Sequence, residues 1–141
     1  MNSEQIEELF ESANQNKYSY VLMLPLGDAV LEQHIENWLA ERVNLVKTSV
    51  YAPEDLRHMF ERADYVLCSV GALKCVLDTT KPVFVNIHTD DLDIMNQDNI
   101  LVFDPARNED KIKIDYNQYL ELAIKCLKKD LDDKWIPYYE V

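Results

Sequence analysis

The chain has 141 residues, of which 48% are hydrophobic, and its 26 acidic against 14 basic side chains give a formal net charge of −12. This length suits one domain with a sizeable core, and the negative charge argues against direct binding to nucleic acid or to an anionic membrane. No apolar run reaches membrane-spanning length, and Met1–Phe10 is acidic and amphipathic rather than signal-like, so we expect a cytoplasmic protein. The charge has two interpretations: simple solubility, or an acidic surface that meets a basic partner protein.

The first segment, Asn2–Asn14, predicts an amphipathic helix. Ser3 is its expected N-cap, and a polar break follows at Asn14–Lys17. We assign residues 1–16 to this leading helix. Its apolar stripe contains Ile6, Leu9, Phe10 and Ala13.

The next segment predicts a β-loop-α-β unit, around which the chain is organised. Tyr18–Leu24 is apolar at nearly every position, which is typical of a strand buried on both faces. Asp28 can cap a helix that runs to Arg42, and a second strand follows over Leu45–Tyr51. The apolar face of this helix contains Val30, Leu31, Ile35, Trp38 and Leu39.

Strands and helices continue to alternate after this unit. Pro53 suits the first position of a helix, and the core face of that helix contains Leu56, Met59, Phe60 and Ala63. Tyr65–Val70 and Pro82–Ile87 are strand-like runs, and Ile100–Phe103 is a brief fifth one. The last helix covers Asp115–Leu131, with helical spacing of Tyr116, Leu120, Ala123, Ile124, Leu127 and Leu131.

The connections are more polar than these elements. Gly71–Thr80 is a short connection with room for one helical turn, and His88–Asp98 is an acidic loop or short helix. Arg107–Lys113 is charged, so we expect it to be exposed.

The alternation predicts an α/β fold, a flavodoxin-like three-layer sandwich with a parallel sheet of four to five strands in the order 2-1-3-4(-5). We expect a single domain over residues 1–141, with the α/β core in 18–104 and a C-terminal helix and tail in 115–141. Open α/β sheets bind ligands at the carboxyl ends of their strands. The loops at that edge are therefore the first place to look for a site.

Those loops carry few groups suited to chemistry. A phosphate-binding loop needs several glycines and usually a lysine, and a dinucleotide fingerprint needs three glycines, whereas the whole chain has two. The loop after the first strand contains no lysine, serine or cysteine. The candidate site residues at this edge are Leu24, Pro25, Gly27, Asp28, Ser69, Gly71, His88 and Asp90.

Neither a metal nor a catalytic group is assigned from the sequence. Asp90, Asp91 and Asp93 supply oxygens that suit Mg²⁺, but a phosphoacceptor site would also need carboxylates after the first strand, where Asp28 serves better as a helix cap. No Ser/His/Asp or Cys/His arrangement stands out. We therefore expect no cofactor, no metal and no catalytic residue.

The chain has three cysteines, Cys68, Cys75 and Cys126, without CxxC spacing. An odd number without that spacing favours reduced thiols over a disulfide framework or a zinc site. Cys68 lies within a strand and is expected to be a small buried residue. Cys75 is nearer to a loop and is the expected reactive thiol.

The order of elements resembles the EIIB component of sugar phosphotransferase systems, of the lactose/cellobiose or galactitol type. The resemblance covers about Tyr18–Asp91 and is one of pattern. Its matching parts are Tyr20–Leu24 with the following loop and helix, Val46–Tyr51, Pro53–Ala63, the run Ala63-Asp64-Tyr65-Val66-Leu67-Cys68, and Lys81–Ile87. It implies an EIIB-like fold.

One departure changes what this resemblance implies. EIIB proteins carry a phosphorylated cysteine directly after the first strand, where this chain reads Leu24-Pro25-Leu26-Gly27. In this respect the chain resembles the degenerate EIIB-like domain that ends transcription regulators of the Mga/AtxA group. That resemblance implies a C-terminal piece that serves dimerisation and regulation while other domains bind DNA.

Three functions remain open from the sequence. The first is a non-catalytic EIIB-like regulatory and dimerisation module in a phosphotransferase-linked transcription regulator. The second is an acidic inhibitor or immunity-type protein that binds a basic partner. The third is an EIIB phosphocarrier or small enzyme that uses Cys68, Cys75 or the acidic run at Asp90–Asp93.

The tail Trp135–Val141 points to self-association. Its three aromatic rings either fold back on the chain's own core or cover a second subunit, since rings of this size rarely stay in water together. Two-fold homodimers are the commonest oligomers. We therefore expect a homodimer, with interface candidates Trp38, Trp135, Tyr138 and Tyr139.

Overall fold

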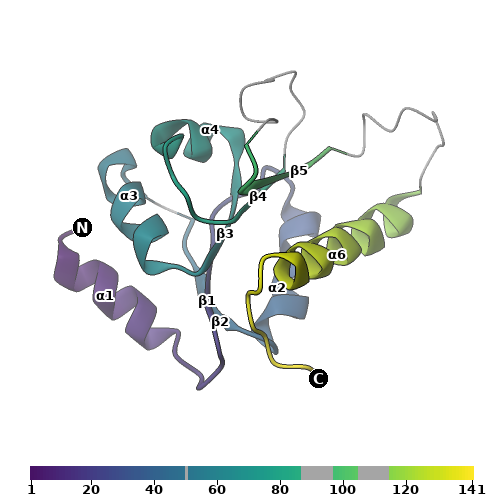
Figure 1. Ribbon diagram of the computed structural model, residues 1–141, viewed down its shortest axis with the longest axis horizontal. Helices are drawn as coiled ribbons and strands as arrows, with labels where there is room; N and C mark the ends of the chain where they lie inside the picture. Colours follow the sequence, from purple (N-terminus) through teal and green to yellow (C-terminus); the bar gives the residue numbers. More distant parts are fainter. Residues whose placement is uncertain (50, 87–96, 105–114) are drawn as a thin grey trace.

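The computed structural model describes residues 1–49, 51–86, 97–104 and 115–141. Their strands form one parallel sheet in the order β2-β1-β3-β4-β5 (Figure 1). This confirms the predicted α/β fold and its flavodoxin-like strand order, including the optional fifth strand. The strands are β1 (Tyr20–Met23), β2 (Asn44–Lys47), β3 (Tyr65–Ser69), β4 (Val83–Asn86) and β5 (Ile100–Phe103).

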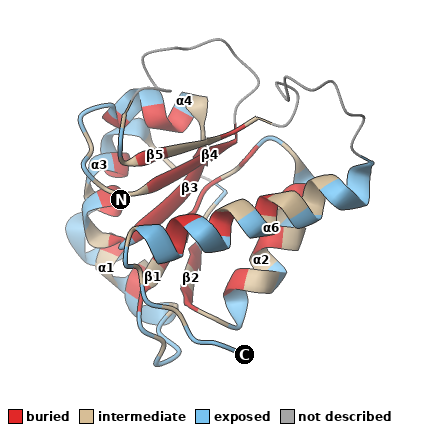
Figure 2. Ribbon diagram, turned by 45° about the vertical axis from the view of Figure 1, so that its right-hand side comes forward, coloured by how far each residue is buried: buried red, intermediate tan, exposed pale blue. Residues whose placement is uncertain are grey.

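Helices cover both faces of the sheet, which makes three layers (Figures 1 and 2). On one face lie α1 (Ser3–Ser12), α3 (Pro53–Arg62) and α4 (Val70–Leu73), the last continued by a 3-10 turn, η1 (Lys74–Val76). The other face carries α2 (Ala29–Ala40) and α6 (Tyr116–Asp133). None of the described helices is both long and apolar enough to cross a membrane.

Each central strand contributes side chains to two separate cores, because successive residues point to opposite faces of a sheet. In β4, Val83 and Val85 pack on the α1–α3 side, and Phe84 packs on the α2–α6 side. The central strand runs are continuously apolar for this reason, since helices cover both faces of the sheet at these strands.

A side-chain cap marks the beginning of α1, α2 and α6, and a proline marks the beginning of α3. Asp28 caps α2 and Pro53 occupies the first turn of α3, as predicted. The prediction that Ser3 caps α1 is wrong, because Asn2 accepts a hydrogen bond from the Gln5 backbone N–H at 2.9 Å. Asparagine and serine cap equally well, so their adjacent positions left the choice open in the sequence.

Two residues assigned to apolar helix faces are exposed. Val30 is 53% exposed and Tyr116 is 49% exposed. Each stands in the first turn of its helix, and the beginning of α6 overhangs the sheet (Figure 2). The helical periodicity of apolar residues predicts which way a side chain points, but it does not predict whether a neighbouring layer of the fold covers that side chain.

The remaining differences concern boundaries. The first two strands are shorter than Tyr18–Leu24 and Leu45–Tyr51, as β1 and β2 show. The predicted helical turn in Gly71–Thr80 is confirmed by α4 and η1. Arg107–Lys113 and most of His88–Asp98 lie outside the described residues.

Candidate functional site

The loop from β1 to α2 lies at the carboxyl edge of the sheet, where the sequence placed the first candidate site. Leu24 and Leu26 are 1% and 2% exposed, so their side chains belong to the core. The Leu24 N–H donates to the Leu67 carbonyl oxygen of β3 at 2.9 Å. Gly27 turns the chain outward with a φ of 85°, a conformation that favours glycine.

Leu26 and Asp28 of this loop make further hydrogen bonds within the fold. The Leu26 N–H donates to Glu32 Oε1 at 3.3 Å, and the Leu26 carbonyl accepts from Asn86 Nδ2 at 2.8 Å. Asp28 Oδ1 accepts from the Leu31 N–H at 3.0 Å and from the Tyr116 hydroxyl at 3.2 Å. Residues 24–28 thus form a loop that is held by hydrogen bonds to other parts of the fold and that contains no nucleophile.

The tyrosines beside Asp28 are held in the neutral form. Burial, together with the charges of Asp28 and Asp104 and the neighbouring Tyr116, raises the pKa of Tyr119 to about 12. Burial and the Asp28 carboxylate also raise the pKa of Tyr116. Both hydroxyls are neutral at pH 7, as an ordinary tyrosine also is, and the raised pKa extends this neutral range to higher pH.

The other carboxyl-edge candidates do not join this loop into a site. Ser69 precedes α4, but within the described chain its side chain makes no capping hydrogen bond. An added Cβ at Gly71 would lie 3.9 Å from Ser69 Oγ, an ordinary contact, so space does not require a glycine there. Pro25 is half-buried, and His88 and Asp90 lie outside the described residues.

Sequence reasoning missed Asn86 at this edge. Its side chain is 4% exposed at the end of β4, and its Oδ1 accepts no hydrogen bond from the described residues. A weak signal was present in the sequence, since Asn86 is the one amide in the otherwise apolar run Pro82–Ile87. Its Nδ2 fixes the β1–α2 loop, which is a positioning role.

The three cysteines differ in accessibility. Cys68 is fully buried in β3, and burial raises the pKa of its thiol to about 12. Cys75 is exposed, with its Sγ 3.5 Å from the Gly71 carbonyl oxygen. Cys126 is half-buried, and burial raises its thiol pKa.

Alkylation at pH 8 should therefore label Cys75 first and Cys68 only after unfolding, because the thiolate is the reactive form. Mass spectrometry after timed exposure to iodoacetamide measures the order, and Cys75→Ser is the control that removes the fast phase. Labelling of Cys68 as fast as Cys75 in the folded protein would contradict this order.

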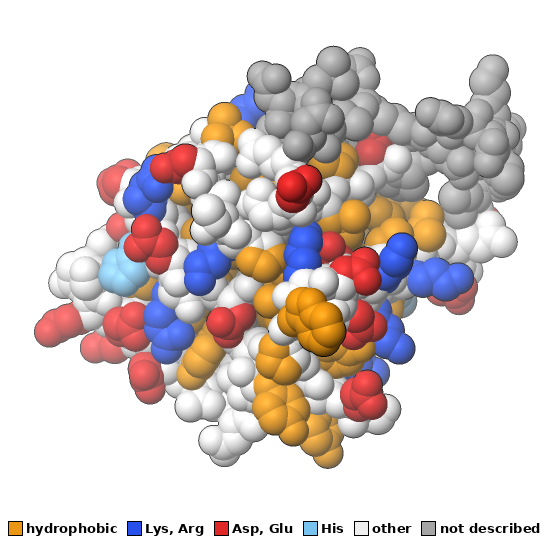
Figure 3. Space-filling model, viewed as in Figure 1, with side chains coloured by type: hydrophobic (Ala, Val, Ile, Leu, Met, Phe, Trp, Pro, Cys, Tyr) orange, Lys and Arg blue, Asp and Glu red, His pale blue; other side chains and the backbone are white. Residues whose placement is uncertain are grey.

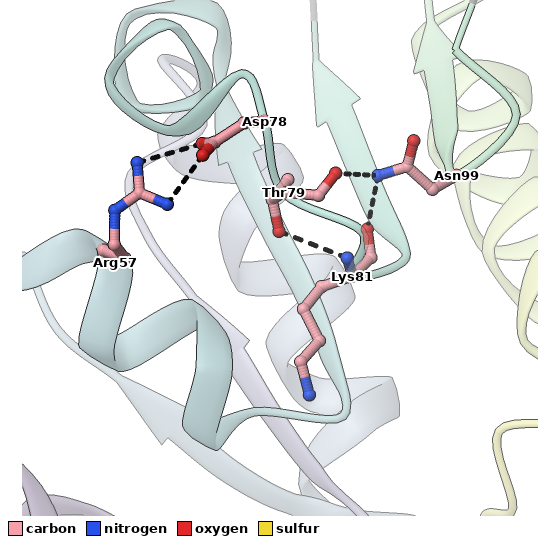
Figure 4. A network of polar contacts seen from close by, with 5 residues as sticks. All are labelled: Arg57, Asp78, Thr79, Lys81 and Asn99. Atoms are coloured by element: carbon pink, nitrogen blue, oxygen red, sulfur yellow. Dashed lines mark hydrogen bonds and ion pairs between the residues drawn. The ribbon is translucent and has the colours of Figure 1, made fainter.

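A hollow of about 120 Å³ at the opposite edge of the sheet is held by structural contacts (Figure 4). Arg57 bonds both carboxylate oxygens of Asp78, at 2.9 and 3.0 Å. Asn99 Nδ2 donates to the carbonyls of Thr79 and Lys81, at 2.9 and 2.8 Å. These bonds hold the chain in place as it enters β4 and β5, which is a structural role for the polar residues around the hollow.

The second candidate surface lies over α2, α6 and the C-terminal tail, and the structure brings most of the predicted interface residues together there. The rings of Trp38 and Tyr138 are 5.9 Å apart, and the Arg42 guanidinium lies 4.5 Å from the Trp38 ring. The Tyr138 hydroxyl donates to Asp132 at 2.9 Å. Burial and that hydrogen bond raise the pKa of Tyr138 to about 12.

The tail folds back on its own chain, one of the two predicted possibilities. Ser19 Oγ donates to the Pro137 carbonyl at 2.6 Å, and the Tyr139 N–H donates to the Arg42 carbonyl at 2.8 Å. The Lys17 ammonium lies 4.4 Å from the centre of the Tyr139 ring. The Tyr139 ring therefore packs against Lys17, whereas the Tyr138 ring packs against Trp38.

Trp135 does not fold back. It occupies the left-handed position of a Schellman turn, in which the Ile136 N–H bonds the Leu131 carbonyl and the Trp135 N–H bonds the Asp132 carbonyl. Its φ of 61° costs a non-glycine residue about 1–2 kcal/mol. Its side chain is 89% exposed.

Three adjoining hollows run across this surface, with volumes of about 410, 240 and 530 Å³. The first lies along the tail, the second shares Tyr138 with it, and the third shares Trp38 and Arg42 with the second. In Figure 3, hydrophobic side chains gather over the tail, flanked by charged ones. We call this the α2–α6–tail face and define it by Trp38, Arg42, Ile124, Lys128, Trp135 and Tyr138.

A buried polar cluster beneath α6 also escaped the sequence reasoning. Tyr65, which is fully buried, donates to Asp130 Oδ2 at 2.5 Å. The Lys134 ammonium lies 2.9 Å from Asp130 Oδ1 and donates to the Asn99 carbonyl at 3.1 Å. The cluster pins the end of α6, and thus the α2–α6–tail face, to the sheet.

No group of three or more histidine, cysteine, aspartate or glutamate side chains suits a metal ion within the described ranges. Comparison with known proteins finds no matching family, no similar curated protein and no similar solved structure.

Proposed function

We propose that this chain is a non-catalytic, cytoplasmic regulatory and dimerisation module. In this proposal it is EIIB-like, of the kind found in phosphotransferase-linked transcription regulators of the Mga/AtxA group, and binds neither nucleic acid nor membrane itself. The observation that carries the proposal is the β1–α2 loop, in which the Asp28 carboxylate and the Leu26 N–H and carbonyl all hydrogen-bond within the fold.

The positions of the thiols support the non-catalytic part. A phosphocysteine needs a thiolate held by backbone amides at a strand-to-helix loop, and residues 24–28 contain no cysteine. Cys68 is buried in β3 and Cys75 follows α4. Neither thiol lies in the loop where an EIIB protein carries its phosphate.

The α2–α6–tail face supports the dimerisation part. A domain without chemistry acts through what it binds, and buried interface centres are rich in tryptophan, tyrosine and arginine. Trp38, Arg42 and Tyr138 form one contacting group on this face, in which the two rings are tilted and the Arg42 guanidinium lies over the Trp38 ring, beside the exposed Trp135. The partner in this proposal is a second copy, with further protein domains or a basic protein as additional partners.

Sedimentation equilibrium tests the proposal. The intact chain is expected to be a dimer at tens of micromolar, and a chain ending at Lys134 is expected to be largely monomeric because it lacks the tail. Far-UV circular dichroism of both is the control for folding. A monomeric intact chain would refute dimerisation, and an unchanged dimer after truncation would remove the tail from the interface.

Two further measurements separate the alternative functions. A monomer that binds a basic protein with strong salt dependence would favour the acidic inhibitor, given the net charge of −12. Phosphate uptake from a phosphoenolpyruvate-dependent relay, lost in Cys68→Ala or Cys75→Ala, would favour the phosphocarrier. We expect no phosphate uptake by the intact chain.

A further inference from the structure

The outside of α6 carries a line of exposed side chains that ends in Trp135. Glu121 and Lys128 are seven residues apart, nearly two helical turns, and both are exposed. Trp135 follows after another seven residues, beside Asp132 at the end of the helix. The backbone of Trp135, just past the end of the helix, therefore lies about 10 Å beyond that of Lys128 along the helix axis.

A hollow lies on the other side of Lys128, between α2 and α6. Its volume is about 530 Å³, and its walls include Trp38, Glu121 and Ile124. Ile124 precedes Lys128 by four residues, about 6 Å along the helix. This hollow offers apolar contact for an indole ring and a carboxylate acceptor for its N–H.

The charges on the outside of α6 are balanced, unlike those of the chain as a whole. Its exposed charged residues are three acidic and three basic, namely Glu121, Lys125, Lys128, Lys129, Asp132 and Asp133, in a chain with 26 acidic and 14 basic residues. Two copies can meet through this helix without the repulsion that a net charge of −12 otherwise imposes. An antiparallel arrangement would bring Lys125 close to Asp132 of the partner subunit.

We infer that Trp135 is the anchor of a symmetric contact between two copies of this chain. Each Trp135 inserts into the hollow between α2 and α6 of the other copy, and the two-fold axis crosses α6 near Lys128. This inference rests on the proposed dimerisation and names its contact. One surface patch supplies both the projecting ring and the hollow, as a two-fold interface requires.

The backbone at Trp135 supplies the decisive variant. Glycine is the usual residue at the left-handed position of a Schellman turn, so Trp135→Gly should relieve strain and raise the unfolding midpoint of the monomer. The same change removes the anchoring ring, so the Kd of the dimer should rise at least about thirtyfold, the effect of losing a strong interface residue. A folding defect cannot produce both results.

Asn16→Gly is the matched control. Asn16 is the other non-glycine residue with positive φ in the described ranges, at 60°, and it lies outside the contact we infer. This change should relieve less strain, because asparagine tolerates the left-handed conformation better than tryptophan does, and it should leave the Kd within about twofold of the wild type.

Cross-linking tests the placement of the axis. In a Cys75→Ser, Cys126→Ser background, Lys128→Cys should form an intermolecular disulfide under mild oxidation, because the two copies of residue 128 lie near the axis. Thr80→Cys, exposed at the amino edge of the sheet, is the control and should not cross-link.

The outcomes separate this inference from the proposed function. A monomeric wild type overturns both. A wild-type dimer that Trp135→Gly leaves equally tight overturns the inference and leaves dimerisation standing. A dimer weakened by Trp135→Gly without a cross-link at position 128 overturns the inferred axis, whereas both expected results together support the contact.

Discussion

Replacing Phe84 with alanine should lower the free energy of unfolding by about 3–5 kcal/mol. Phe84 is fully buried at the centre of β4, between β3 and β5. Its ring stacks on that of Phe103 with centroids 5.5 Å apart, and Phe103 in turn lies 5.5 Å from Tyr119 of α6. The strands are hydrogen-bonded on both sides of the ring, so the cavity has little freedom to collapse.

Urea unfolding followed by far-UV circular dichroism measures this loss. Tyr18→Ala is the matched control, because Tyr18 is 70% exposed and its ring should contribute less than about 0.5 kcal/mol. A loss below about 1.5 kcal/mol for Phe84→Ala would contradict a rigid core on the α2–α6 side of the sheet.

The sheet could be predicted from the sequence because its signal is local. Successive residues are apolar in Tyr65–Val70 and in Pro82–Ile87, so both faces of these strands need to be covered by other elements. The helical periodicity between such runs indicates helices that connect parallel strands. Asp28 and Pro53 marked helix starts through side-chain chemistry that acts within one turn.

Features that depend on distant partners could not be predicted in the same way. Tyr65 and Asp130 are 65 residues apart, and the sequence around each residue does not indicate that the other is its hydrogen-bond partner. A weaker signal was present, since Asp130 lies seven residues after Ala123 and three after Leu127, on the buried stripe of α6. A carboxylate in such a position must find a partner, although the stripe does not say which one.

The candidate site likewise has features that are local in the sequence and features that depend on distant partners. The lack of a nucleophile in residues 24–28 is visible in the sequence, whereas the hydrogen bond from Asn86 to Leu26 depends on the fold. The tail was recognised from its aromatic residues. Its division into a packed Tyr138 and an exposed Trp135 follows from a Schellman turn that carries tryptophan where glycine is usual.

The Tyr65 hydroxyl leads to the second large expected effect. Tyr65→Phe should lower the free energy of unfolding by about 2–3 kcal/mol at pH 7, because hydrogen bonds to buried charged groups are worth more than neutral ones. The variant keeps the ring but leaves the Asp130 carboxylate, on a residue that is 8% exposed, to its ion pair with Lys134. Tyr18→Phe, which removes a hydroxyl from an exposed ring, should change stability by less than about 0.5 kcal/mol.

The same hydroxyl should make the difference between wild type and variant depend on alkaline pH. Burial, and then the Asp130 carboxylate, raises the pKa of Tyr65 well above its usual value of 10.0. Above pH 10 the unfolded chain has lost this proton while the folded chain still holds it, so the stabilisation is complete below pH 10 and declines as pH rises. The slope is at most about 1.4 kcal/mol per pH unit.

Phenylalanine has no such proton, so the stability difference between wild type and Tyr65→Phe should be constant from pH 7 to 9 and shrink above pH 10. Tyr119 and Tyr138, whose pKa values are also raised, are present in both proteins, and their contributions cancel in the difference. Urea unfolding of the two proteins at several pH values between 7 and 11 measures it. A stability difference that stays constant up to pH 11 would mean that Tyr65 ionises as readily in the folded chain as in the unfolded one. In that case the Tyr65–Asp130 hydrogen bond would not contribute to holding α6 on the sheet.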